Sequence, residues 1–155
     1  MTKPGSKKDA KDSRSAGSRR QVAALPFRLS KSAGIEILLI TSRDTHRAVI
    51  PKGWPMKGLT DPDAAAREAL EEAGIVGKVS RKPVGSFEYW KRLASTFEFV
   101  TVDVYPLEVK RQRKSWPEKG DRQFAWFARE DAALLVDEPA LSTLIRTFTT
   151  RSKTG

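Results

Sequence analysis

The apolar and polar positions of this chain alternate in a way that predicts mainly β-strands, interrupted by helices. The runs of strand length are rich in β-branched or aromatic residues and cover 22–30, 34–42, 47–51, 82–90, 95–109 and 122–128. Residues 129–136 and 138–148 instead carry apolar side chains at the three- to four-residue spacing typical of helices. Strands broken by one central helix and followed by C-terminal helices predict an α/β or α+β layer structure.

The clearest predicted helix is the central one, over residues 61–73. Thr60 or Asp61 can cap its N-terminus, and Pro62 then falls in the first turn, where proline is tolerated. Gly74 follows the last helical residue and can close the helix in a left-handed conformation. The segment is rich in alanine, which favours helix formation and allows close approach to a sheet.

Three carboxylates share one face of this helix, because Glu68, Glu71 and Glu72 stand at i, i+3 and i+4. Like charges at this spacing cost about 0.2–0.5 kcal/mol per pair on an exposed helix. The neighbouring Arg67 cannot neutralise all three. Taken alone, the triplet is most simply interpreted as a solvated acidic face.

The loop before the helix changes this interpretation. It contains glycines and two lysines, Lys52 and Lys57, whose ammonium groups suit a phosphate. Hard carboxylate oxygens beside phosphate-binding cations are typical of Mg²⁺ or Mn²⁺ sites. The pattern therefore favours a divalent-cation site that acts on a phosphate compound.

The segment from Gly53 to Ile75 resembles the signature sequence of the Nudix hydrolases. In that signature, glycine is followed after five residues by glutamate, and after seven more by Arg-Glu-apolar-any-Glu-Glu-any-Gly-apolar. "REALEEAGI" stands here at the right distance from Gly53. The departure is Leu59, which replaces the first glutamate. The resemblance implies the Nudix fold, a mixed β-sheet sandwiched between α-helices, over residues 19–150.

The resemblance also implies the roles of the signature residues. The cation, Mg²⁺ or Mn²⁺, would be bound by three carboxylates and by a backbone carbonyl of Lys52 or Gly53; the carboxylates are those of Glu68, Glu71 and Glu72. Arg67 would orient these carboxylates by charge-assisted hydrogen bonds. The reaction would be hydrolysis of a phosphoanhydride by a metal-activated water. The general base stays open between Glu68 and a residue outside the signature, with Glu88 and Glu98 as candidates.

Leu59 leaves Arg67 without the partner that the signature glutamate usually provides, which could weaken metal binding or slow turnover. Two alternatives to a hydrolase of highly phosphorylated small molecules stay open. One is a housecleaning pyrophosphatase of nucleoside diphosphates linked to another group, which would need an aromatic slot for the base. The other is a non-catalytic module that binds RNA or a phosphorylated ligand. The retained glutamates favour a hydrolase, because a pure polyanion binder gains nothing from three carboxylates.

Three further segments resemble the branch that hydrolyses diphosphoinositol polyphosphates and diadenosine polyphosphates. They read "RRQVAALPFR", "LLITSRDTHRAVIPKG" and "VGSFEYWKR". The match implies a polyphosphate pocket lined by Arg20, Thr41, Arg43, Lys52 and Arg92, in which arginine forks would bind phosphate oxygens. Ala48 and Lys52 depart from that branch, which has an aromatic residue and a glycine there. Trp54, Trp90 and Trp116 are candidates for stacking a nucleobase.

Composition adds expectations about the ends of the chain and about its partners. The net charge of +10 is concentrated partly in the first residues, so we expect 1–18 to be a disordered basic tail, and 151–155 a C-terminal tail. A polyanion such as nucleic acid is conceivable for that tail, but a polyphosphorylated small molecule is the favoured partner. There is no cysteine and no apolar run of membrane-spanning length. We expect a cytoplasmic monomer or homodimer.

Overall fold

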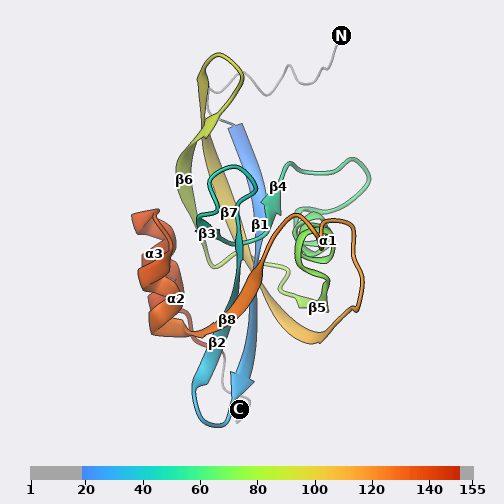
Figure 1. Ribbon diagram of the computed structural model, residues 1–155, viewed down its shortest axis with the longest axis vertical. Helices are drawn as coiled ribbons and strands as arrows, with labels where there is room; N and C mark the ends of the chain where they lie inside the picture. Colours follow the sequence, from blue (N-terminus) through green and yellow to red (C-terminus); the bar gives the residue numbers. More distant parts are fainter. Residues whose placement is uncertain (1–18, 151–155) are drawn as a thin grey trace.

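The computed structural model describes residues 19–150, which form a curved eight-stranded mixed sheet with helices on both sides (Figure 1). The elements in chain order are β1 (Arg19–Ser30), β2 (Gly34–Thr41), β3 (Ala48–Val49), β4 (Lys52–Gly53), α1 (Asp61–Ala73), β5 (Ile75–Val79), β6 (Gly85–Arg92), β7 (Phe97–Gln112), β8 (Phe124–Ala128), α2 (Arg129–Leu135) and α3 (Pro139–Thr147). This arrangement confirms the predicted α+β class with helices on either side of a mixed sheet. The predicted tails, 1–18 and 151–155, lie outside the described residues.

The parallel pair of β1 and β7 forms the middle of the sheet. Its register aligns Arg19 with Val100 and continues to Phe27 opposite Glu108. β2 is antiparallel to β1, and both β5 and β6 are antiparallel to β7. The short strand β4 pairs with the first half of β1, and β8 pairs with β2. This pairing brings the start of β1 next to the loop that precedes α1.

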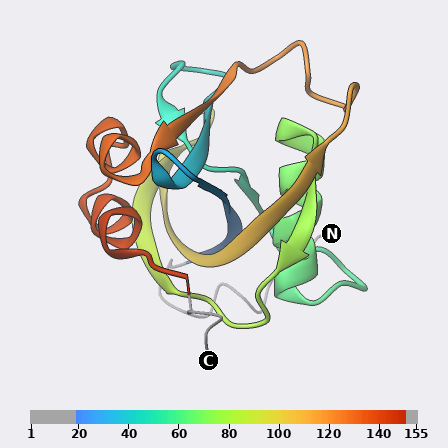
Figure 2. The same ribbon diagram turned by 90° about the horizontal axis from the view of Figure 1, so that it is seen from below.

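The sheet separates two apolar cores, because successive side chains of a strand point to opposite faces. Figure 2 shows the curled sheet with α1 on one side and α2 and α3 on the other. Along β1, Ala23 and Leu25 belong to the core under α2 and α3, whereas Val22 and Ala24 belong to the core under α1. The side of β1 that a residue faces therefore decides which neighbours it meets.

The predicted caps of α1 are present. Thr60 is the N-cap and its hydroxyl accepts a hydrogen bond from the backbone N–H of Asp63 at 3.3 Å. Gly74 closes the helix with φ of 72° and donates its N–H to the carbonyl of Leu70 at 3.0 Å. Buried alanines such as Ala65 and Ala69 allow the helix to lie close to the sheet. Leu59 packs against the same core as an apolar side chain.

Most predicted strands are present with ends shifted by a few residues, and two parts of the sheet differ from the prediction in more than their ends. The expected strand 47–51 is instead two short strands, β3 and β4, separated by the buried Ile50 and Pro51. β5 was not predicted, because its sequence "IVGKV" is short and contains a glycine. A Cβ at Gly77 would lie 2.1 Å from the carbonyl oxygen of Glu108 on β7. That close approach of two backbones explains the glycine, and no local pattern reports it.

Candidate functional site

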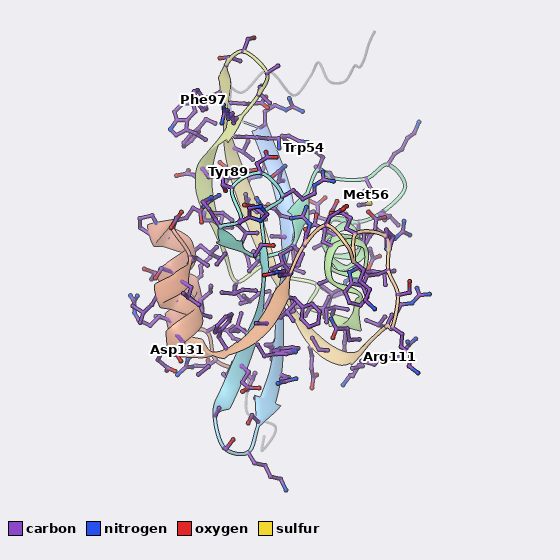
Figure 3. The ribbon with its side chains drawn as sticks, viewed as in Figure 1. Trp54, Met56, Tyr89, Phe97, Arg111 and Asp131 are labelled. Carbon is purple, nitrogen blue, oxygen red and sulfur yellow. The ribbon has the colours of Figure 1, made fainter. Side chains whose placement is uncertain are left out.

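A polar cavity of about 500 Å³ opens beside the N-terminal half of β1. Its walls come from β1, the loop of residues 42–47, β4, α1, β6 and the loop of residues 113–123. Figure 3 shows Trp54 and Tyr89, two of the lining residues, in the half of the molecule that carries β4 and β6. The cavity therefore joins the signature segment to strands and loops that are distant in the sequence.

Two of the three signature carboxylates, those of Glu68 and Glu72, line this cavity. The Glu68 carboxylate lies against the backbone of Gly53, so closely that a Cβ there would be 2.1 Å from its Oε2. The backbone N–H of Lys52 points at Oε1 of Glu72 at 3.4 Å. The loop and the helix are thus held together by the side chains that the signature specifies, and only glycine at position 53 leaves room.

The two carboxylates lack a full set of counter-charges. Glu72 is only 7% exposed; burial, and then the adjacent Glu68, raises its pKa to about 9. Burial likewise raises the pKa of Glu68. The nearest guanidinium nitrogen, Nη2 of Arg122, is 3.8 Å from Oε2 of Glu72. Two adjacent carboxylates, one buried and one half-buried, favour either a shared proton or a bound cation.

This donor set fits a divalent cation. Among residues 19–150, no three carboxylate or imidazole side chains converge as a complete ligand set. Mg²⁺, however, is commonly held by one or two carboxylates and completes its shell with waters and substrate phosphates. Glu68, Glu72 and the carbonyl of Gly53 are the groups of this chain that would hold it.

The other two signature residues are placed differently. Glu71 does not line the cavity, although its carbonyl accepts a hydrogen bond from the N–H of Glu118 at 3.0 Å. Arg67 is exposed and forms no hydrogen bond or ion pair with any residue in the described part of the chain. This agrees with the apolar Leu59 in the place of a glutamate. No contact among the described residues supports the orienting role expected of Arg67.

Glu118 and Arg122 also line the cavity, and sequence reasoning missed both. Arg122 donates from Nε to Oε1 of Glu118 at 2.8 Å and from Nη1 to the carbonyl of Thr41 at 3.1 Å. Their segment reads in the sequence as a run of charged residues without strand or helix periodicity. The i, i+4 spacing of these opposite charges was the available signal, but nothing local relates it to the signature helix.

Trp116 fastens the 113–123 loop to the end of α1. Its ring lies on Gly74, where a Cβ would be 2.2 Å from the nearest ring atom. The N–H of Arg113 donates to the carbonyl of Gly74 at 2.8 Å. Trp116 does not line the cavity, so the prediction that it could stack a base is wrong for this conformation; it anchors the loop instead.

The predicted phosphate-binding residues divide into two groups. Arg43, Lys52 and Arg92 line the cavity. Arg20 and Thr41 do not: Arg20 points to the other face of β1 and donates to Asp103 at 2.6 Å. The hydroxyl of Thr41 accepts from the backbone N–H of Gln123 at 3.0 Å. These two residues are committed to structural contacts rather than to a pocket.

The two outside candidates for the general base also fall away from the cavity. Glu98 accepts from Nη1 of Arg19 at 2.8 Å, and Glu88 is exposed on β6. Neither lines the cavity. Outside the signature, the carboxylates that line the cavity are those of Glu118 and Asp44, and Glu118 is close enough to raise the pKa of both Glu68 and Glu72.

In EDTA, the thermal midpoint of the protein is expected to fall as the pH rises from about 5 to about 8. The native Glu68–Glu72 pair keeps a proton that the unfolded chain releases near the ordinary pKa of 4.5. The native state then binds more protons than the unfolded state, so the unfolding free energy decreases with pH. Above about 8, Lys52 acts in the opposite direction, because burial lowers its pKa to about 8. Thermal melts across this range measure the slope.

Glu72→Gln should flatten the dependence of the thermal midpoint on pH. The control Glu88→Gln changes an exposed residue of β6 and should leave this dependence unchanged. Saturating Mg²⁺ should also reduce the slope, because a bound cation replaces the proton. An equal slope in wild type and Glu72→Gln would contradict the shared-proton interpretation.

Comparison with known proteins gives a consistent picture of the family. The NUDIX domain model matches residues 17–148. Nudix hydrolase 18, mitochondrial, of Arabidopsis thaliana is 34% identical over 123 residues, covering 75% of this chain and 68% of that protein. Diphosphoinositol polyphosphate phosphohydrolase 2 of Rattus norvegicus is 34% identical over 119 residues, covering 75% of this chain and 62% of that protein. The chain spans 52% to 69% of the length of five matched Arabidopsis relatives.

Solved structures agree in fold. The C. elegans Ap4A hydrolase superimposes with a TM-score of 0.59 at 22% identity, over 83% of this chain and 93% of that one. The E. coli dihydroneopterin triphosphate pyrophosphohydrolase does so with a TM-score of 0.61 at 16% identity, over the same shares. Within residues 19–150, no helix has both the length and the apolar character needed to cross a bilayer. The match of one family model to most of the chain, together with its relatives, places this protein in the Nudix hydrolase family.

Proposed function

We propose that this protein is a divalent-metal-dependent hydrolase of phosphoanhydride bonds in a highly phosphorylated small molecule, either a diadenosine polyphosphate or a diphosphoinositol polyphosphate. The observation that carries the proposal is the pair of the buried Glu72 and the half-buried Glu68, which faces the same cavity as Arg43 and Arg92. Carboxylates for a cation and arginines for phosphates then lie in one space of about 500 Å³.

Each lining group has a distinct task in this proposal. Glu68, Glu72 and the carbonyl of Gly53 would hold the cation, which when bound would neutralise charge on the phosphate oxygens and make the attacking water more acidic. Arg43 and Arg92 bind and orient the remaining phosphates. Glu118, held by the hydrogen bond from Arg122, accepts the proton of the attacking water. The water oxygen bonds to one phosphorus of the phosphoanhydride as the bridging P–O bond breaks, and the phosphate on the other side of the bridge leaves.

Relatives support both substrate classes. The rat relative is named a diphosphoinositol polyphosphate phosphohydrolase, and one structural neighbour is an Ap4A hydrolase. Trp54 and Trp90 line the cavity, which also keeps the housecleaning nucleotide pyrophosphatase under consideration. The preferred metal, a cytoplasmic location and a monomeric or dimeric state stay predictions.

A substrate panel with the purified protein and Mg²⁺ or Mn²⁺ tests the proposal. The panel contains a diphosphoinositol polyphosphate, diadenosine hexaphosphate, diadenosine tetraphosphate and a nucleoside diphosphate sugar, with nucleotide or phosphate release as the readout. Metal-dependent release from one of the first three, above release from the sugar nucleotide, supports the proposal. No release from any of them by the folded protein would refute it and favour the non-catalytic module. Preferred cleavage of the sugar nucleotide would favour the housecleaning enzyme.

Arg43→Ala is expected to raise KM most for the substrate with the most phosphates, by about tenfold for diadenosine hexaphosphate. Arg43 is exposed at the rim of the cavity, where it can reach phosphates distant from the cation. The expected effect on the sugar nucleotide is at most about twofold. Initial rates over a concentration series give both values. The matched control, Arg20→Ala, removes an arginine that pairs with Asp103 outside the cavity. An equal rise of KM for all substrates with Arg43→Ala would argue against a polyphosphate pocket.

A further inference from the structure

Gln21 is a buried polar side chain in the cavity that neither the signature nor the proposed reaction uses. It is 3% exposed and lines the cavity. Its Oε1 accepts a hydrogen bond from the hydroxyl of Tyr89 at 2.7 Å. No residue among 19–150 accepts a hydrogen bond from its Nε2. The amide is therefore fixed on one side, and its two N–H donors are available to a ligand in the cavity.

The strand register places Trp54 next to Gln21. The antiparallel register of β1 and β4 pairs Ala23 with Lys52 and Val22 with Gly53. Continued by one residue, the register places Gln21 opposite Trp54, at a separation where cross-strand side chains contact each other. Trp54 also lines the cavity.

Both aromatic rings are held in place by cations. The guanidinium of Arg19 lies 4.5 Å from the centre of the Trp54 ring and also pairs with Glu98 at 2.8 Å. The ammonium of Lys52 lies 4.8 Å from the centre of the Tyr89 ring. These contacts restrict the rings before any ligand binds, which reduces the entropy cost of binding.

We infer that Gln21, Trp54 and Tyr89 form a nucleobase-recognition wall, so that the substrate of this hydrolase is a nucleotide whose base stacks on Trp54 and accepts a hydrogen bond from the Gln21 amide. A planar base offers a π face to the indole and uncharged acceptors to the amide. An inositol polyphosphate has no planar ring and presents charged oxygens on most sides. It would gain more from a cation at position 21 than from an amide.

This inference rests on the proposed function for the position of the phosphates, and it selects the nucleotide over the inositol class. Isothermal titration calorimetry in the presence of Mg²⁺ tests it with ligands that cannot be cleaved. The α,β-methylene analogues of the four ribonucleoside diphosphates are compared with methylenediphosphonate, which carries the same bridge without a nucleoside. At least one of the nucleotides is expected to bind on the order of tenfold tighter. No preference for any of the four would overturn the inference.

Substitutions test which residues of the nucleobase-recognition wall cause the preference for the nucleotide over methylenediphosphonate. Gln21→Leu and Trp54→Leu should each remove most of it while leaving the affinity for methylenediphosphonate unchanged. Trp54→Phe should retain part of it, because a smaller ring still stacks. Tyr89→Phe keeps its ring and loses only the hydroxyl that orients Gln21, so it should weaken the nucleotide alone and is expected to fold. The control Gln123→Leu should change nothing, because Gln123 is exposed and hydrogen-bonds through its backbone.

The failures of the two proposals are distinguishable. A nucleotide preference that depends on Gln21 and Trp54, without hydrolysis in the substrate panel, would refute the proposed function and leave this inference standing. Inositol hexakisphosphate binding tighter than every nucleotide, and equally well to wild type and to Gln21→Leu, would overturn this inference and leave the hydrolase standing. Equal weakening of methylenediphosphonate and nucleotide by the leucine variants would also overturn it, since the wall would then only maintain the phosphate site.

Discussion

Glu72→Gln is expected to lower kcat/KM by about 10³-fold or more on every substrate that the wild-type protein cleaves. The side chain lies 7% exposed in the cavity, within 3.4 Å of the loop backbone at Lys52. A glutamine keeps this size and shape but offers one neutral carbonyl oxygen in place of a charged carboxylate, so it holds a divalent cation much more weakly. Initial rates at several Mg²⁺ concentrations measure the loss and show whether excess metal restores activity.

The same variant should fold as well as the wild type. Without metal at about pH 8, its thermal midpoint is expected to be equal or higher, because a glutamine is neutral in both states, whereas the native Glu68–Glu72 pair must keep a proton that the unfolded chain has released at this pH. Glu71→Gln is the neighbouring comparison, since Glu71 does not line the cavity, and it should reduce kcat/KM much less. Wild-type activity in Glu72→Gln would remove this residue from the metal site. A large fall in its midpoint would make its role structural.

Gly74→Ala is expected to lower the free energy of unfolding by about 2–4 kcal/mol. The residue has φ of 72°, which costs a side-chain-bearing residue about 1–2 kcal/mol. In addition, its new methyl group would be 2.2 Å from the Trp116 ring, which must move. Urea unfolding followed by circular dichroism measures the change.

Gly34→Ala separates these two contributions. Gly34 also has φ of 72°, but nothing lies within 4 Å of the position of its Cβ. It should therefore show the backbone strain alone, and the difference between the two variants reports the packing of Trp116. Equal losses would mean that Trp116 does not depend on the glycine.

Displacement of the Trp116 ring in Gly74→Ala should also lower activity. Trp116 holds the loop that carries Glu118 and Arg122 into the cavity, so Gly74→Ala should reduce kcat even at temperatures where the variant is fully folded. Gly34→Ala should retain wild-type kcat, because its turn lies between β1 and β2, away from the cavity. Unchanged kcat in Gly74→Ala would show that the loop reaches the cavity without this anchor.

The sequence by itself determined the central helix and the face on which its carboxylates lie. Capping by Thr60, the left-handed Gly74 and the three- to four-residue spacing of the glutamates are local properties, set by backbone geometry within one helix. The same segment resembles the Nudix signature, and the family model and the relatives confirm the family. The α+β class followed from periodicity, and the structure and the solved neighbours confirm it.

Only the tertiary structure decided which residues surround those carboxylates. Arg20 and Gln21 are adjacent, but successive side chains of a strand point to opposite faces, so Arg20 meets Asp103 and Gln21 enters the cavity. Resemblance favoured the arginine, whereas the register of β1 with β4 and β7 selected the glutamine. A shift of that register by one residue would have turned Arg20 toward the cavity and Gln21 to the opposite face of the sheet.

The positions of Glu118 and Arg122, in the 113–123 loop, were also decided only by the tertiary structure. Glu118 and Arg122 are distant from the signature in sequence, and long-range contacts bring them to it: Trp116 packs on Gly74, and the N–H of Glu118 donates to the carbonyl of Glu71. Glu98, a candidate base from the sequence, pairs instead with Arg19 on the neighbouring strand. Local sequence determines which groups a helix displays, and long-range pairing and packing decide which distant groups they meet, because those contacts depend on register and volume rather than on spacing along the chain.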